Sequence, residues 1–262
     1  MASGWEAYAD AWHRDTLPVS TWMVEAIAPQ PGHRVLELAA GLGDTGYLAA
    51  ELVAPGGEVI LSDFVPEMLT AAQKRAKHGN VRFRQMDMNV PLDQPAASLD
   101  GVLCRWGYML VNDPEAALKE TRRVLRPGGT VALSAWTDPG ENPWTSAAPR
   151  ILQQRGIVGP DQPGPGQFAW ADRDVIRENL EAAGFVEYRI EPLDFVMRYD
   201  DVDHWWVVQT QTGSRVAEAD KTMDYAARSD VLADLEKVAE RFELPDGSLA
   251  VPARTWVAAA TA

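Results

Sequence analysis

The 262-residue sequence contains a single cysteine, Cys104, and this excludes internal disulfides and a cysteine-rich metal site. Within the apolar run Val102–Cys104 we expect it to be a small buried hydrophobic residue. No stretch approaches the ~20 apolar residues needed to cross a bilayer. The N-terminus, MASGWE, lacks the basic and apolar regions of a signal peptide. We therefore expect a cytoplasmic protein without a membrane span.

Basic residues are also scarce. Lys and Arg total 24 against 38 Asp and Glu, which gives a formal net charge of -14. Such a charge opposes a phosphate backbone, so we expect no nucleic-acid partner. The four histidines, at positions 13, 33, 78 and 204, show no ligand spacing, and we expect no metal.

The hydrophobic pattern of the first 137 residues alternates between strands and helices. Helices are expected around Trp5–Trp12 and Val19–Ala28, and then after the first, second and fourth strands. The expected strands are 34–38, 58–62, 81–86, 99–104 and 130–135. This alternation predicts an α/β fold, doubly wound around a mostly parallel sheet.

The pattern breaks after Trp136 into an irregular stretch to Trp144 and a Gly/Pro-rich stretch from 156 to 166. A helix is expected over 172–183, then a strand over 185–199 that Pro192 must interrupt. Two or three helices should fill 201–242, and Pro252 predicts a bulge or a late start in a last strand over 249–259. We interpret the whole chain as one domain, with an N-terminal helical lid (1–30), a ligand-binding core (33–136) and lid insertions plus the last two strands (137–262).

The loop Gly41-Leu-Gly-Asp-Thr-Gly46 follows a strand and precedes a helix, and Asp63 ends the next strand. Glycines there let the backbone turn and approach a ligand at the helix N-terminus. One carboxylate at the end of the second strand suits any ribose. The pattern therefore leaves dinucleotides, flavins and S-adenosylmethionine (SAM) open.

Glu37 lies within the strand before this loop. The charge of its carboxylate distinguishes between these classes of ligand. A carboxylate beside a pyrophosphate is unfavourable, whereas SAM brings an ammonium and a sulfonium, both cationic. The alternative is that Glu37 only accepts backbone hydrogen bonds. An NAD(P)-dependent oxidoreductase stays open as a rival, but it offers no reason for Glu37.

At this point the sequence resembles the class I SAM-dependent methyltransferases, in the group similar to the ubiquinone/menaquinone-biosynthesis enzymes. The resemblance rests on VLELAAGLG (35–43), LSDFVPEML (61–69), QMDM (85–88), DGVLCRWGYM (100–109), RVLRPGG (123–129) and AAGF (182–185). It implies a Rossmann-like, seven-stranded sheet with an antiparallel last strand and a helical lid over the strand ends. Ala39 departs from the glycine of many members.

The resemblance also implies SAM as the cofactor and S-adenosylhomocysteine as the product. Asp63 would hold the ribose hydroxyls, Phe64 would lie against the adenine, and Asp87 with Met88 would frame the adenine amino edge. Arg105 stands where the family backbone meets the methionine end of SAM, although its side chain could simply pair with an acid. The full set of expected cofactor residues is Glu37, Ala39, Gly41, Gly43, Asp63, Phe64, Met68, Asp87, Met88, Asn89 and Arg105.

Methyl transfer mainly requires that the acceptor atom be oriented behind the methyl group. His13, His204 and Tyr108 are candidate bases, but none can be assigned. The tryptophan-rich segments favour an aromatic or polycyclic small-molecule acceptor, methylated at oxygen, nitrogen or carbon. The expected acceptor residues are Trp12, Trp106, Tyr108, Trp136 and His204. A non-catalytic SAM-binding protein stays open as an alternative, and we expect a monomer or homodimer.

Overall fold

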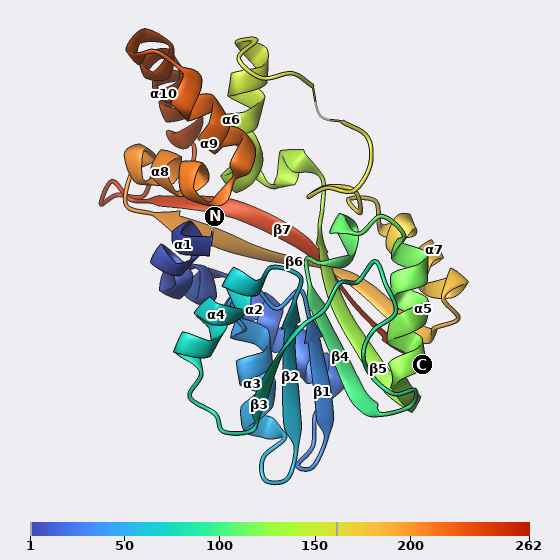
Figure 1. Ribbon diagram of the computed structural model, residues 1–262. Helices are drawn as coiled ribbons and strands as arrows, with labels where there is room; N and C mark the ends of the chain where they lie inside the picture. Colours follow the sequence, from blue (N-terminus) through green and yellow to red (C-terminus); the bar gives the residue numbers. More distant parts are fainter. Residues whose placement is uncertain (1, 161) are drawn as a thin grey trace. The chain divides into compact units, whose positions relative to one another are not determined.

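A seven-stranded mixed sheet is the framework of the protein (Figure 1). The computed structural model describes residues 2–160 and 162–262. In space the strands follow the order β3-β2-β1-β4-β5-β7-β6. Their bounds are β1 (Arg34–Leu38), β2 (Glu58–Asp63), β3 (Val81–Gln85), β4 (Leu99–Arg105), β5 (Leu125–Trp136), β6 (Val186–Tyr199) and β7 (Leu249–Thr261).

Strands β1 to β5 pair in parallel, and β7 runs antiparallel to β5. The predicted mostly parallel sheet with an antiparallel last strand is therefore confirmed. Since β1 lies between β2 and β4, the strand order reverses there. In open α/β sheets, ligands bind at the carboxyl ends of the strands at such a switch point.

The parallel strands β1, β2 and β4 are mostly buried and apolar because helices cover the sheet. In β1 and β4 the leucines Leu36, Leu38 and Leu103 are buried, and Cys104 is fully buried as expected. Helix α3 packs on β1 and β2, α4 on β2 and β3, and α5 on β5. The helices are α1 (Ala2–Ala7), α2 (Ala9–Ile27), α3 (Asp44–Leu52), α4 (Pro66–Arg75), α5 (Pro114–Val124), α6 (Pro143–Gln154), α7 (Arg173–Ala182), α8 (Val202–Thr212), α9 (Ser214–Thr222) and α10 (Tyr225–Ala239).

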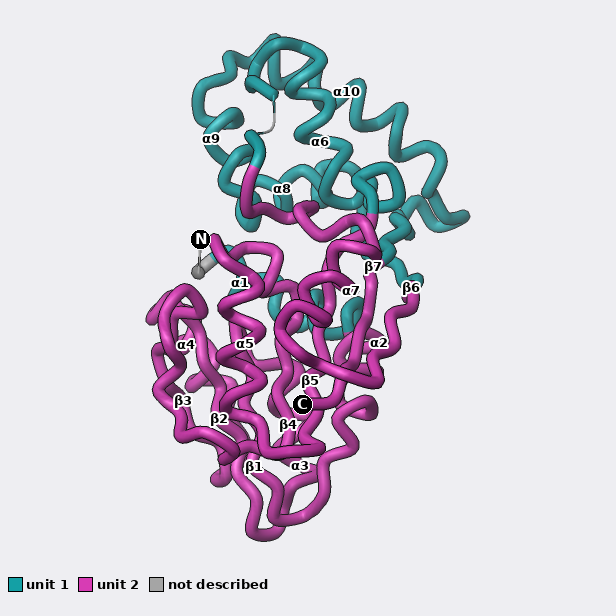
Figure 2. The backbone as a smooth tube through the Cα atoms, turned by 90° about the vertical axis from the view of Figure 1, so that its right-hand side faces the viewer, with its two compact units in different colours: residues 1–16, 138–163, 194–254 teal, residues 17–137, 164–193, 255–262 magenta. Residues whose placement is uncertain are grey.

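The chain divides into two compact units (Figure 2). Unit 1 comprises residues 1–16, 138–163 and 194–254 and is mainly helical. Unit 2 comprises residues 17–137, 164–193 and 255–262, and it holds β1 to β5 with their helices. The single-domain organisation and the lid over the strand ends stay predictions.

Prolines account for most departures from the expected elements. Helix α2 is continuous through Pro18, where we expected a break between two helices, and α6, which begins at Pro143 and contains Pro149, was not expected. Pro143 is tolerated at the first turn, where its missing N–H has no helical partner anyway.

The expected interruption of the sixth strand was wrong. Strand β6 runs through Pro192, and as the last strand of the sheet it is an edge strand, where proline is tolerated. Pro252 lies in β7 before the pairing with β5 begins at Thr255, so it removes no bond from that ladder. Among residues 2–160 and 162–262, no helix combines the length and apolar character that crossing a bilayer requires.

Candidate functional site

The loop between β1 and α3 is held in an unusual backbone conformation at the switch point. Ala39, Gly41 and Gly43 have φ angles of 50°, 55° and 84°. Such angles are natural for glycine but cost an alanine energy. Ala39 thus occupies a position whose geometry favours glycine, in keeping with its departure from the related sequences.

Asp63, at the end of β2, ties this loop to the neighbouring strand. Its Oδ2 accepts a hydrogen bond from the N–H of Gly41 at 2.8 Å, and its Oδ1 accepts one from the N–H of Val65 at 2.9 Å. Burial raises the pKa of the carboxyl group, while the backbone bonds lower it. A carboxylate offers about four acceptor positions, so this one can still accept from a ligand's hydroxyl groups.

Phe64 follows directly and is 62% exposed. Its ring is therefore not buried beneath the sheet edge, and its role toward an adenine stays a prediction. Met68, on the first turns of α4, is half-buried. An exposed phenyl ring beside the Asp63 carboxylate suits a flat apolar ligand group next to a polar one.

Glu37 is almost completely buried, with 1% of its surface exposed. Its Oε2 accepts a hydrogen bond from the N–H of Gly46 at 2.8 Å, in the first turn of α3. Burial raises the pKa of the carboxyl group to about 8, although Arg105 and the Gly46 bond lower it. The structure thus gives Glu37 the backbone-acceptor role of the alternative interpretation, and its role toward a cationic ligand stays a prediction.

Asp44, which the sequence analysis missed, links two arginines at the start of α3. Its carboxylate lies 3.4 Å from a guanidinium nitrogen of Arg105 and 3.5 Å from one of Arg75. Arg105 therefore pairs with an acid, as one of its two interpretations expected. The signal available was the position of Asp44 directly after Gly43, where an acid favours the helix N-terminus. With Glu37 and Asp63, it surrounds the loop with carboxylates.

The residues after β3 form a turn held by its own side chains. Asp87 Oδ1 accepts hydrogen bonds from both the backbone N–H and the side-chain amide of Asn89, each at 2.8 Å. Asn89 Oδ1 in turn accepts from the N–H of Asn112 at 2.9 Å. The structure thus gives the Asp87 carboxylate a capping role after β3, and its role toward an adenine stays a prediction.

Met88 lies beside the glycine loop rather than in the core alone. A Cβ on Gly107 would come within 2.8 Å of Ala39 Cβ and 3.7 Å of the Met88 sulfur. The structure therefore brings together residues that follow the carboxyl ends of β1, β3 and β4, as the family resemblance implied.

The aromatic residues expected to bind an acceptor fall in both units. In unit 2, Trp106 has a φ of 58° and stacks on Trp136, with ring centroids 4.2 Å apart. Its Nε1 donates to Thr255 Oγ1 at 2.9 Å. These bonds hold a bulky residue in the left-handed conformation, and such strain persists only where surrounding structure over-determines it.

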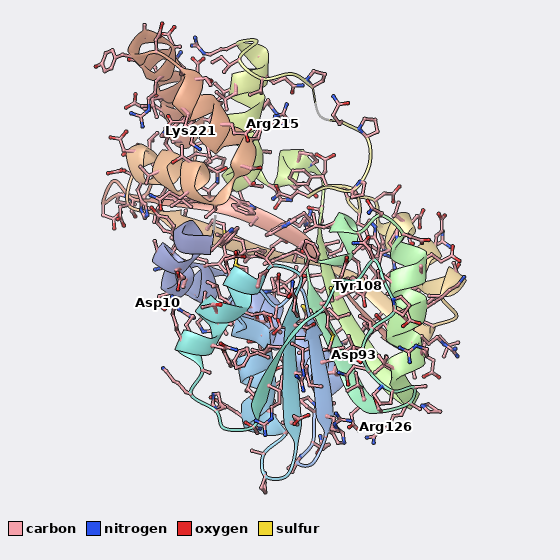
Figure 3. The ribbon with its side chains drawn as sticks, viewed as in Figure 1. Asp10, Asp93, Tyr108, Arg126, Arg215 and Lys221 are labelled. Carbon is pink, nitrogen blue, oxygen red and sulfur yellow. The ribbon has the colours of Figure 1, made fainter. Side chains whose placement is uncertain are left out.

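Tyr108, labelled in Figure 3, is fully buried in unit 2. Its hydroxyl lies 2.6 Å from Thr121 Oγ1, and its ring stacks on Trp170. Burial raises the pKa of the hydroxyl well above its usual value. Nothing in this environment suits a general base.

Trp12 and His204 belong to unit 1. Trp12 makes an edge contact with Trp5 at 4.9 Å between ring centroids and lies 5.7 Å from Trp144. His204 Nδ1 accepts the N–H of Asp200 at 3.0 Å. In the described residues, no three His, Cys, Asp or Glu side chains converge so as to hold a metal ion.

Comparison with known proteins gives several matches. Residues 38–133 match the family model described as "Methyltransferase domain". The chain is 33% identical over 178 residues to the demethylmenaquinone methyltransferase of Clavibacter sepedonicus, covering 63% of this chain and 71% of that protein. It is 35% identical over 120 residues to the ubiquinone/menaquinone biosynthesis C-methyltransferase UbiE of Cellvibrio japonicus, covering 44% of this chain and 48% of that protein.

The match thus spans about half the length of the Cellvibrio protein. Among solved structures, the YcgJ protein from Bacillus subtilis superposes with a TM-score of 0.60 at 19% identity, covering 94% of this chain and 98% of that one. At that identity the likeness establishes a shared fold.

Proposed function

Because the chain belongs to the class I SAM-dependent methyltransferases, in the group similar to the ubiquinone/menaquinone-biosynthesis enzymes, we propose that it binds SAM at the glycine loop of unit 2 and methylates a small molecule. The observation that carries this proposal is the bond between the Asp63 carboxylate and the Gly41 N–H. It holds the loop while leaving acceptor positions for the two ribose hydroxyls.

The other residues around the loop fit the remaining parts of SAM. The exposed Phe64 offers a face for the adenine, and the turn of Asp87, Met88 and Asn89 would frame the adenine amino edge. Asp44 and Asp63 place carboxylate groups at the loop, and a bound cation would favour the ionised form of Glu37 over the protonated form that its burial favours. That charge favours a ligand with an ammonium and a sulfonium over one with a pyrophosphate.

SAM supplies an activated methyl group, because its sulfur leaves as a neutral thioether that keeps the electron pair of the broken bond. The protein's part is to hold the acceptor atom in line with the sulfur–methyl bond and to exclude water. A base is needed only if the acceptor loses a proton, and we assign none.

For the acceptor we propose an aromatic small molecule methylated at carbon. The stacked pair of Trp106 and Trp136, both buried, places aromatic rings at the carboxyl ends of β4 and β5, the end of the sheet where the loop lies. The names of the two relatives point to quinone-type rings and, for one, to carbon. The net charge of -14 favours a small molecule over a nucleic acid.

Calorimetric titration with SAM, S-adenosylhomocysteine and NADH tests the cofactor. We expect both sulfur nucleosides to bind in the micromolar range and NADH not to bind. Asp63→Ala should weaken SAM binding about 10- to 150-fold, since a hydrogen bond to a charged group contributes roughly 1.5–3 kcal/mol. Asp93→Ala, which removes an exposed carboxylate of unit 2, is the matched control and should bind normally (Figure 3).

Binding of NADH without the sulfur nucleosides would overturn the proposal. For the acceptor, we would supply demethylated naphthoquinols with SAM and measure S-adenosylhomocysteine. Bound SAM without turnover on any aromatic acceptor would contradict the acceptor class alone.

A further inference from the structure

A pocket of about 740 Å³ lies entirely within unit 1. It is lined by α6, by the end of α10 with the residues that follow, and by the unit 1 parts of β6 and β7. Helices α6 and α10 pack against each other, as both views of the chain show (Figures 1 and 2). The volume is in the range of small-molecule sites.

Apolar side chains form much of the lining. Ile151 comes from α6, Phe195 from β6, and Val238 and Phe242 from the end of α10 and just beyond it. Two phenyl rings and branched aliphatic groups suit a flat or aliphatic ligand body.

Some charged side chains of the pocket are paired with one another, and others are not. Arg254 donates to Glu141 Oε1 at 2.8 Å, and its Nε lies 2.9 Å from Asp194 Oδ1. Both acidic side chains of the lining are therefore already paired with one arginine.

Two further arginines line the same pocket, Arg150 on α6 and Arg241 after α10. Within the described chain neither forms an ion pair or a hydrogen bond, although Arg241 lies over the Phe242 ring. The other arginines of unit 1 all hold a carboxylate or carbonyl oxygen: Arg14, Arg155, Arg198, Arg215, Arg228 and Arg254.

Among the described residues of unit 1, the two arginines without a polar partner share one pocket, and both side chains are exposed. We propose that this pocket binds an apolar organic anion, such as an aromatic carboxylate, with Arg150 and Arg241 holding the anionic group. A guanidinium presents paired N–H donors that match a carboxylate. The site lies within unit 1 and does not depend on the cofactor proposal for unit 2.

The probe is 2-naphthoate, titrated by calorimetry in the absence of SAM, with 2-naphthylmethanol as the uncharged counterpart. We expect 2-naphthoate to bind saturably and 2-naphthylmethanol to bind much more weakly. The affinity for 2-naphthoate should fall as the salt concentration rises from about 0.05 to 0.5 M. Arg150→Gln and Arg241→Gln should each weaken 2-naphthoate binding about 5-fold, and the double variant about 25-fold.

Gln154→Glu, at an exposed lining position of α6, should also weaken binding because it adds a repelling charge. Lys221→Gln is the matched control. It removes one exposed positive charge from α9 of the same unit, away from the lining, and should bind 2-naphthoate normally (Figure 3).

The inference is overturned if 2-naphthoate does not bind, if the alcohol binds equally well, or if the arginine variants bind like the wild type while circular dichroism shows them folded. SAM is titrated separately. Absence of 2-naphthoate binding would therefore not bear on the SAM proposal, and absence of SAM binding would not bear on the unit 1 pocket.

Discussion

Glu37→Gln tests whether the buried carboxyl group at the glycine loop is protonated in the folded protein. Burial raises the folded-state pKa to about 8, from an ordinary value of 4.5. Between these two values the folded chain holds a proton that the unfolded chain has lost. The stability of the wild type should therefore fall as pH rises from about 4.5 to 8 and level off above that range.

At about 1.36 kcal/mol for each pH unit, the full effect is roughly 5 kcal/mol, a large part of the 5–15 kcal/mol typical of a domain. A glutamine is neutral throughout, and its carbonyl can still accept from the Gly46 N–H. The difference in stability between wild type and variant should therefore be small near pH 5 and should favour the variant increasingly toward pH 8.

Urea unfolding at pH 5, 6.5 and 8, followed by tryptophan fluorescence, measures this difference. The exposed Asp93→Asn serves as a control and should parallel the wild type at each pH. Parallel profiles for Glu37→Gln and wild type would refute the reasoning. So would a wild type that gains stability over the variant as pH rises.

Three further changes test the loop and its surroundings. Gly46→Ala should destabilise the protein by about 1–3 kcal/mol in thermal melts, because the added Cβ would lie 2.1 Å from a Leu61 methyl and 2.6 Å from the Glu37 carboxylate. The control Gly79→Ala adds a Cβ where there is open space, and it should leave the melting temperature unchanged. Ala39→Gly should raise stability by about 0.5–1 kcal/mol by relieving the φ of 50°, and unchanged or lower unfolding midpoints would contradict this. Tyr108→Phe should cost about 1 kcal/mol of stability but leave kcat intact, and a large loss of kcat in a folded variant would restore the tyrosine as a base.

The sequence predicted the sheet well because its strands carry local signals. The apolar runs of β1 and β4 are legible without tertiary information, and so is the loop that begins at Gly41. Strand alternation then implied that Asp63 and the loop meet at one edge, and their hydrogen bond confirms that proximity.

Features that depend on tertiary contacts could not be predicted from the sequence. Helices α2 and α6 continue past prolines because packing outweighs a lost backbone bond, which local propensity cannot show. The ion pair of Arg105 with Asp44 joins residues from β4 and α3 that only the folded chain brings together. Likewise, no sequence pattern indicated that Trp106 adopts a left-handed conformation.

The way the backbone passes repeatedly between the two units bears on how such a protein could be altered or could diversify. Helix α2 and strands β6 and β7 each begin in one unit and end in the other. Neither unit is one continuous segment of the chain. Neither can therefore be excised, or replaced by that of a relative, as a single segment. Exchanging unit 1 between relatives would require five junctions, and three of them fall within α2, β6 and β7. Gradual substitution along the chain is thus an easier route to a new ligand preference than recombination of whole modules.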